Sequence, residues 1–206
     1  MVEKVKSEDG ESQNQGRMTT RRALKREAIL DAAAAQLAEG GLATATLDRV
    51  GERVGLSKAA LYYYVDSRDD LLAALIDRLL AGMRTDAAAR AGADASPLEQ
   101  LRAFLCAHIE QAATLPEGQL VVSNVDALAA APETARALHD HELVARQLVE
   151  AAIAGGELRS IDPLIATTVL FGAGNTLCRV FDSGGPRSLD EMIAATLDLT
   201  LGAWAT

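Results

Sequence analysis

Three side chains between positions 58 and 63 could bind a nucleic acid. Lys58, Tyr62 and Tyr63 each carry a group that can donate a hydrogen bond to a phosphate oxygen or to a base edge. On an ordinary surface, two adjacent tyrosines would expose large aromatic rings without any gain in buried area. The residue types therefore favour a contact with DNA over a plain solvent-facing surface.

The residues around these side chains predict two short helices that meet at a glycine. Gly55 stands where a helix can close in the left-handed conformation, and Ser57 can cap a second helix over residues 58–64. An ordinary helical hairpin would share these features, but the outward residues favour a helix-turn-helix, whose second helix enters the major groove. Before the glycine, apolar residues recur at the spacing of one helix face: Leu47, Val50 and Val54.

The stretch from Thr46 to Leu72 resembles the DNA-binding region of tetracycline-repressor (TetR) family transcription regulators. The most specific parts of the resemblance are the pair Leu61-Tyr62 and the segment Ser67-Arg68-Asp69-Asp70-Leu71-Leu72. Three positions depart from the family pattern, in which phenylalanine, threonine and lysine are usual: Val65, Ala60 and Arg68. Ala60 leaves one polar side chain fewer on the recognition helix.

The resemblance implies a set of DNA-binding residues on this head. We expect base or phosphate contacts from Lys58, Tyr62 and Tyr63, and a weaker phosphate contact from Arg49. The remaining expected members either position the DNA backbone or lie on the recognition helix: Thr46, Ser57, Arg68, Ala59 and Ala60. A basic N-terminal arm adds further candidates for phosphate or minor-groove contacts: Arg17, Arg21 and Arg22.

The charge distribution agrees with this placement, although the whole chain of 206 residues carries a net charge of −9. Residues 17–78 have a net charge of +1, whereas residues 79–206 have −8. The acidity therefore lies outside the proposed reading head, which removes the main objection to a nucleic-acid partner.

Composition favours helix, and the apolar spacing and helix end signals along the chain predict an all-α protein of about nine helices. Alanine and leucine dominate, and apolar residues make up 49% of the sequence. We expect a disordered tail over 1–18, a helix-turn-helix domain over 19–66, and an effector-binding and dimerisation domain over 67–206. The tract from Pro163 to Cys178 is too short and too polar for a membrane span. Two cysteines and no secretion signal fit a reduced cytoplasm.

The last two helices, predicted near 163–181 and 189–204, have more apolar residues than one neighbour could cover. They could form the core of a single subunit or an isologous four-helix interface between two copies. Members of the resembling family usually dimerise in the second way, so we expect a homodimer. A dimer presents two recognition helices, which would read a palindromic operator.

The resemblance also implies a cavity among the central helices that binds a small effector and releases the DNA. Candidate residues are polar or aromatic side chains within apolar helices: Phe104, His108, Gln111, Asn124, Phe171 and Asn175. Taken singly, each polar candidate fits a satisfied position in the core or in an interface better than a pocket, whereas Phe104 and Phe171 could equally line a pocket or fill the core. Because few charges stand among them, we expect a largely apolar effector.

An enzyme is the contrasting hypothesis. His139 and His141 could form a metal or acid–base pair, but residues two apart on a helix point to different sides, so a solvated helix face is expected. Cys106 and His108 are also two apart, and common catalytic or phosphate-binding motifs are absent. We therefore expect no catalytic site, cofactor or metal. A helical interaction module without DNA binding stays open beside the regulator, which we expect to be a repressor.

Overall fold

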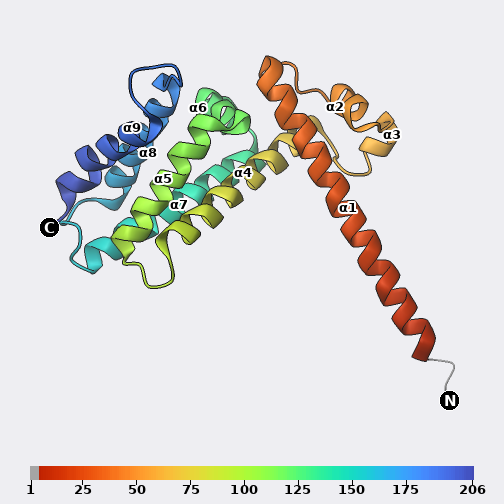
Figure 1. Cartoon of the computed structure of the whole chain (residues 1–206), viewed down its shortest axis with the longest axis horizontal. Helices are drawn as coiled ribbons and strands as arrows, with labels where there is room; N and C mark the ends of the chain where they lie inside the picture. Colours follow the sequence, from red (N-terminus) through yellow and green to blue (C-terminus); the bar gives the residue numbers. More distant parts are fainter. Residues whose placement is uncertain (1–4) are drawn as a thin grey trace. The chain divides into compact units, whose positions relative to one another are not determined.

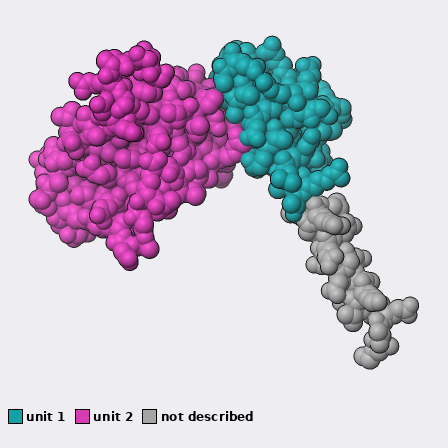
Figure 2. All heavy atoms as spheres, in the orientation of Figure 1, with its two compact units in different colours: residues 1–71 teal, residues 72–206 magenta. Residues whose placement is uncertain are grey.

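The computed structural model describes residues 20–206 in full and, over residues 5–19, the helical backbone alone. Helix α1 spans Val5–Gly40, so its backbone begins before the predicted start at Thr20. The predicted disordered tail (1–18) and the arm residue Arg17 fall outside the residues whose side chains are described. The tail therefore stays a prediction. The chain forms two compact units, Met1–Leu71 and Leu72–Thr206 (Figure 2).

The first unit contains the predicted pair of short helices after α1. Helix α2 spans Leu47–Val54 and begins at the cap Thr46, and α3 spans Lys58–Leu61 after the cap Ser57 (Figure 1). Gly55 has φ 65° and ψ 37°, which confirms the predicted left-handed turn. A Cβ at Gly51 would lie 3.1 Å from the carbonyl oxygen of Leu56, so a side chain there would crowd the turn.

The second unit holds the rest of α4 and five further helices. Helix α4 spans Arg68–Ala91, so it starts in the first unit. The helices that follow are α5 (Pro97–Thr114), α6 (Pro116–Leu128), α7 (Pro132–Ala154), α8 (Pro163–Val180) and α9 (Leu189–Leu197). These nine helices of the described chain confirm the predicted all-α class. The sole β feature among the described residues is an isolated bridge between Leu158 and Ala205.

Helix α5 is the centre of the second unit. It packs against α6, α7 and α8, and these helices lie side by side in Figure 1. Its buried face includes Leu101, Leu105 and Ile109. A Cβ at Gly174 of α8 would lie only 3.0 Å from Cγ1 of Ile109, so the missing side chain allows α8 to approach α5 closely. Within the described residues, no helix is long and apolar enough to cross a membrane.

One helix end differs from the prediction, and one helix is irregular where a regular one was expected. Helix α3 stops at Leu61 rather than near Tyr64, because the carbonyl of Leu61 accepts the amides of both Tyr64 and Val65 in a tight turn. The last helix runs over Leu189–Leu197, continues as a π-helical turn, Asp198–Gly202, and returns to α-helix up to Trp204, where the sequence predicted its end. In α6, Asn124 has non-helical backbone angles (φ −135°, ψ 23°) that kink the helix.

Candidate nucleic-acid interface and ligand cavity

The side chains singled out on the head point into solvent. Tyr62 is 44% exposed and Tyr63 is 62% exposed, and the Lys58 side chain is 65% exposed. Their predicted outward placement is confirmed. The Lys58 ammonium lies 3.2 Å from a carboxylate oxygen of Asp48, an equally exposed partner on α2. An exposed ion pair of this kind contributes little to the stability of the fold, so Lys58 can leave Asp48 for a DNA phosphate at a small cost in free energy.

Two of the predicted residues act as helix caps. The Thr46 hydroxyl accepts the amide of Arg49 at 3.4 Å, and the Ser57 hydroxyl accepts the amide of Ala60 at 3.3 Å. Each capping oxygen satisfies one of the free amides in the first helical turn. The hydroxyl hydrogens stay free to donate, so capping does not exclude a phosphate contact.

Arg68 is held inside the head. Its Nε donates to the carbonyl oxygen of Ala45 at 2.8 Å, and its Nη2 donates to the carbonyl oxygen of Leu42. The guanidinium therefore ties the start of α4 to the loop that precedes the Thr46 cap. With these donors engaged within the head, the geometry gives Arg68 a positioning role. The sequence had suggested a place among the DNA-contacting residues.

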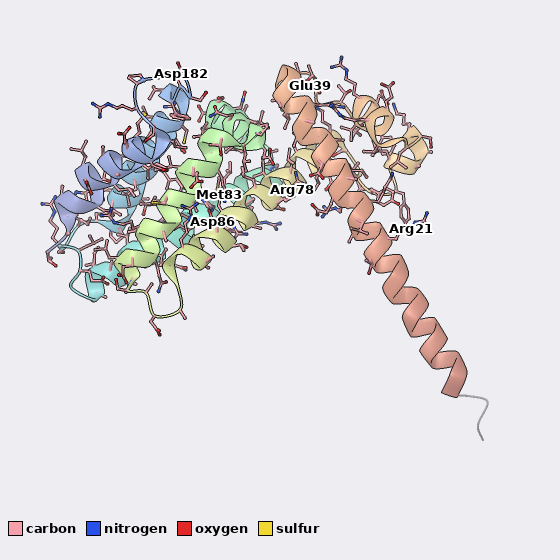
Figure 3. All side chains as sticks on the ribbon, viewed as in Figure 1. Arg21, Glu39, Arg78, Met83, Asp86 and Asp182 are labelled. Carbon is pink, nitrogen blue, oxygen red and sulfur yellow. The ribbon has the colours of Figure 1, made fainter. Side chains whose placement is uncertain are left out.

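The remaining head candidates are on the surface. The guanidinium of Arg22 lies 5.0 Å from the ring centroid of Tyr63, a cation–π contact that joins α1 to the turn after α3. Arg21, labelled in Figure 3, is exposed on the same helix. Arg49 and Ala59 are exposed as well, whereas Ala60 is half-buried.

A cavity of about 40 Å³ lies within the second unit. Its walls come from α4, α5, α6, α7 and α8, and most of them are aliphatic. Helix α4 contributes Leu79, Leu80 and Met83, the last of which is labelled in Figure 3. The polar groups in the wall are His108, Asn175, His141 and Glu142. A second, more open hollow of about 390 Å³ is lined by residues that include Phe104, Arg84 and Val144.

Three of the four polar groups of the cavity form a connected chain. Nδ1 of His108 lies 3.2 Å from Nε2 of His141, and Nε2 of His108 lies 3.0 Å from Oδ1 of Asn175. Both histidines are buried. Phe104 and Phe171 enclose the pair, with ring centroids 4.7 and 5.7 Å from the imidazole of His141. The hydrogen bonds thus run through a largely apolar shell.

Burial keeps both imidazoles neutral. Removal from water, together with the nearby His108 and Arg84, lowers the pKa of His141 to about 2. Burial also lowers the pKa of His108, against an opposing hydrogen bond from Asn175. Neutral imidazoles can each donate one hydrogen bond and accept another, which suits them to a polar contact inside a cavity.

The predicted cavity residues do not all come together. His108, Phe171 and Asn175 line the cavity, whereas Phe104 lines the open hollow beside it. Two others face different partners: the Gln111 amide donates to a carboxylate oxygen of Asp86 at 3.3 Å, and the Asn124 amide donates to the carbonyl of Leu120 at 2.9 Å. Neither of these two lines the cavity or the hollow.

His141 was missed by the sequence reasoning. The expectation of a solvated face is right for His139 and Asp140, which are exposed, and wrong for His141, which is 2% exposed. A signal was available, because His141 begins a series of buried positions at helical spacing that continues with Ala145, Val149 and Ala152.

Helix α8 exposes an apolar stripe. Its exposed residues include Leu164, Ile165, Val169 and Val180, of which the last three share one side of the helix, at separations of about one and three turns. Gly172 is also exposed, and a Cβ built there would meet no atom within 4 Å. Nothing in the described part of the subunit therefore requires a glycine at this position. No cluster of three or more metal-ligating side chains occurs among the described residues.

Comparisons with known proteins identify the family to which this architecture belongs. Residues 29–75 match the family model for bacterial regulatory proteins of the tetR family, and residues 94–203 match the tetracyclin repressor-like C-terminal domain. A transcriptional regulator of the TetR/AcrR family from Thermobifida fusca YX-ER1 has 28% identity and a TM-score of 0.63, covering 88% of this chain and 98% of that one.

Two further relatives extend the comparison. The HTH-type transcriptional regulator BetI of Rhizobium meliloti (strain 1021) is 33% identical over 82 residues, which are 40% of each protein. AibR, solved in complex with isovaleryl coenzyme A and operator DNA, shares the fold at 17% identity and a TM-score of 0.70, covering 85% of this chain and 97% of that one. With both of its units matched by family models, the chain belongs to the TetR family of bacterial transcriptional regulators, which are not enzymes.

Proposed function

We propose that this regulator binds a palindromic DNA operator as a homodimer and represses transcription until a small, largely apolar effector releases it. The observation that carries the proposal is the exposure of Lys58, Tyr62 and Tyr63 on the glycine-hinged helix pair of a TetR-family head. These side chains can reach base edges or phosphates, and few of their donors are used within the subunit.

The DNA-binding step is tested by selecting binding sites from random duplexes with the full chain. A palindromic consensus would support the proposal, and the absence of any enriched sequence would favour an interaction module without DNA binding. On the selected site, Lys58→Ala is expected to weaken binding and to lower the salt slope by about 1 if Lys58 meets a phosphate. Arg136→Ala, an exposed cation on α7, serves as the matched control and should leave the slope unchanged.

The homodimer is proposed to form through α8 and α9. The exposed apolar stripe of α8 supports it, because such a stripe is left unpaired within the subunit. Gly172 adds a second argument. A glycine inside a helix costs about 1 kcal/mol relative to alanine, and the open space around Gly172 gives no compensation within the subunit. A partner helix that crosses closely at this point would supply one.

Analytical sedimentation, which reports the oligomeric state, tests this interface. Gly172→Leu should shift the protein toward the monomer, because a side chain would hold the two helices apart. Ala127→Leu, at an exposed position on α6, should sediment as the wild type does. If Gly172→Leu also sediments like the wild type, the partner does not pack on α8 at this position.

The effector is proposed to bind in the cavity of the second unit and to act through α4. At about 40 Å³ the cavity holds one or a few waters, whereas ligand pockets occupy roughly 300–1,000 Å³. A ligand must therefore move the walls apart, and Leu79, Leu80 and Met83 of α4 are among those walls. The same helix begins at Arg68 in the head.

This linkage supports coupling between ligand and DNA binding, which requires that the ligand bind the two conformations with different affinity. The ion pair of Arg78 with Glu117, at 3.6 Å, joins α4 to the first turn of α6 and gives wall movement a further route to α4. AibR shows that this fold accommodates both a ligand and operator DNA. A screen for compounds that release the selected duplex tests the mechanism.

A further inference from the structure

The polar chain inside the cavity joins three helices. Asn175 comes from α8, His108 from α5 and His141 from α7, and Gly174 makes the contact possible by letting α8 approach α5. The chain ends at Nδ1 of His141. This nitrogen is buried and has no hydrogen-bond partner.

The positions of the hydrogens along this series of hydrogen bonds determine whether Nδ1 of His141 is a donor or an acceptor. Asn175 presents its carbonyl oxygen Oδ1 to His108, so Nε2 of His108 carries the hydrogen. A neutral imidazole has one such hydrogen, so Nδ1 of His108 must accept the N–H of His141 at Nε2. Nδ1 of His141 is then a bare acceptor. A buried acceptor without a partner typically costs about 1–3 kcal/mol, so a donor that reaches it is favoured.

The surroundings narrow the class of molecule that could bring such a donor. The described wall of the cavity is otherwise aliphatic and aromatic, and it contains no lysine or arginine. Its one charged side chain, Glu142, is an exposed carboxylate, which disfavours an anion. A neutral molecule with an apolar body fits these walls best.

We propose that Nδ1 of His141 is the polar anchor of the cavity, and that it binds a neutral, mainly apolar ligand through a hydroxyl or N–H donor. The inference rests on the proposed effector role of the cavity and names the ligand class for it. The atom is covered by neighbouring groups, so the ligand reaches it through the same widening of the walls that the small volume requires.

Three small probes test the anchor on the full chain without DNA: phenol, toluene and anisole. Phenol and toluene have nearly the same shape, but phenol alone can donate a hydrogen bond, and anisole can only accept one. We expect phenol to bind about fivefold more tightly than either, which corresponds to about 1 kcal/mol. Affinities are measured by NMR titration, with the imidazole nitrogens labelled so that phenol alone shifts the Nδ1 resonance of His141.

His141→Phe removes this acceptor and keeps a ring beside Phe104 and Phe171, and it also leaves Nδ1 of His108 without its donor. The toluene affinity should stay within about twofold of the wild type. A preference for phenol that persists in the variant must then come with a shift of the labelled Nδ1 of His108, and a persisting preference without that shift overturns the anchor. If this variant does not fold, the Nδ1 resonance of the wild-type protein still decides the matter.

The outcomes separate the anchor from the effector site. Equal binding of phenol and toluene to the wild type overturns the anchor and leaves the cavity as a ligand site. A preference for anisole shows that Nδ1 carries the hydrogen, which also overturns the proposal. If no probe binds, both the anchor and the cavity fail, while DNA binding is judged independently by the operator selection.

Discussion

Lowering the pH from 7 to 5 should destabilise this protein through its buried histidines. Unfolded His141 has the ordinary pKa of 6.5, whereas the folded protein holds the pKa at about 2. Because the folded value is the lower one, the unfolded chain binds the proton first. The stabilisation is complete above about pH 6.5 and is lost progressively as the pH falls toward 2.

The size of the effect follows from these two values. Between pH 7 and pH 5, linkage gives a loss of about 2 kcal/mol in the free energy of unfolding for His141 alone. His108, whose pKa is also lowered, changes the stability in the same direction. Carboxylates with lowered pKa, such as Asp86 and Glu191, start from ordinary values of 3.8 and 4.5 and act mainly below this window.

Urea unfolding at fixed protein concentration measures the loss, with the single tryptophan, half-buried Trp204, as the fluorescent probe. The control is His141→Phe, which cannot titrate at this position. Its free energy of unfolding should fall by about 2 kcal/mol less than that of the wild type over the same pH range. Equal pH dependence in the two proteins, or protonation of His141 between pH 7 and 5 in NMR spectra, would refute the reasoning.

Two further substitutions test the packing that positions the sites. Arg68→Lys keeps the charge but cannot reach the carbonyls of both Ala45 and Leu42. The free energy of unfolding of the head should therefore fall by about 2 kcal/mol, and operator affinity should drop. Unchanged hydrogen exchange in the loop before α2 would contradict the positioning role. Gly174→Ala places a Cβ 3.0 Å from Cγ1 of Ile109. The crowding should outweigh the better helix propensity, so that thermal unfolding shows a net loss of stability of about 1 kcal/mol. A stabilised variant would show that α8 can shift away from α5 at little cost.

Features that depend on neighbouring residues in the chain could be predicted from the sequence. Gly55 adopts the predicted left-handed turn, and Ser96 and Ser188 form capping boxes with the glutamates three positions further on, a pattern that the sequence displays directly. These signals are readable because the cap and the amide that it satisfies lie within one helical turn. The outward placement of Lys58 followed from the same local pattern.

The tertiary structure decided which polar side chains meet. Gln111 turns to Asp86, Asn124 turns to its own helix, and Arg68 turns into the head, although the sequence suggested sites for all three. His141 joins His108 across two helices, a contact between residues 33 positions apart. Such pairings depend on how closely whole helices pack, and one missing Cβ at Gly174 helps to set that distance. The sequence by itself determined the helices and the reading head, because those depend on short-range bonds; helix packing alone determined the lining of the cavity.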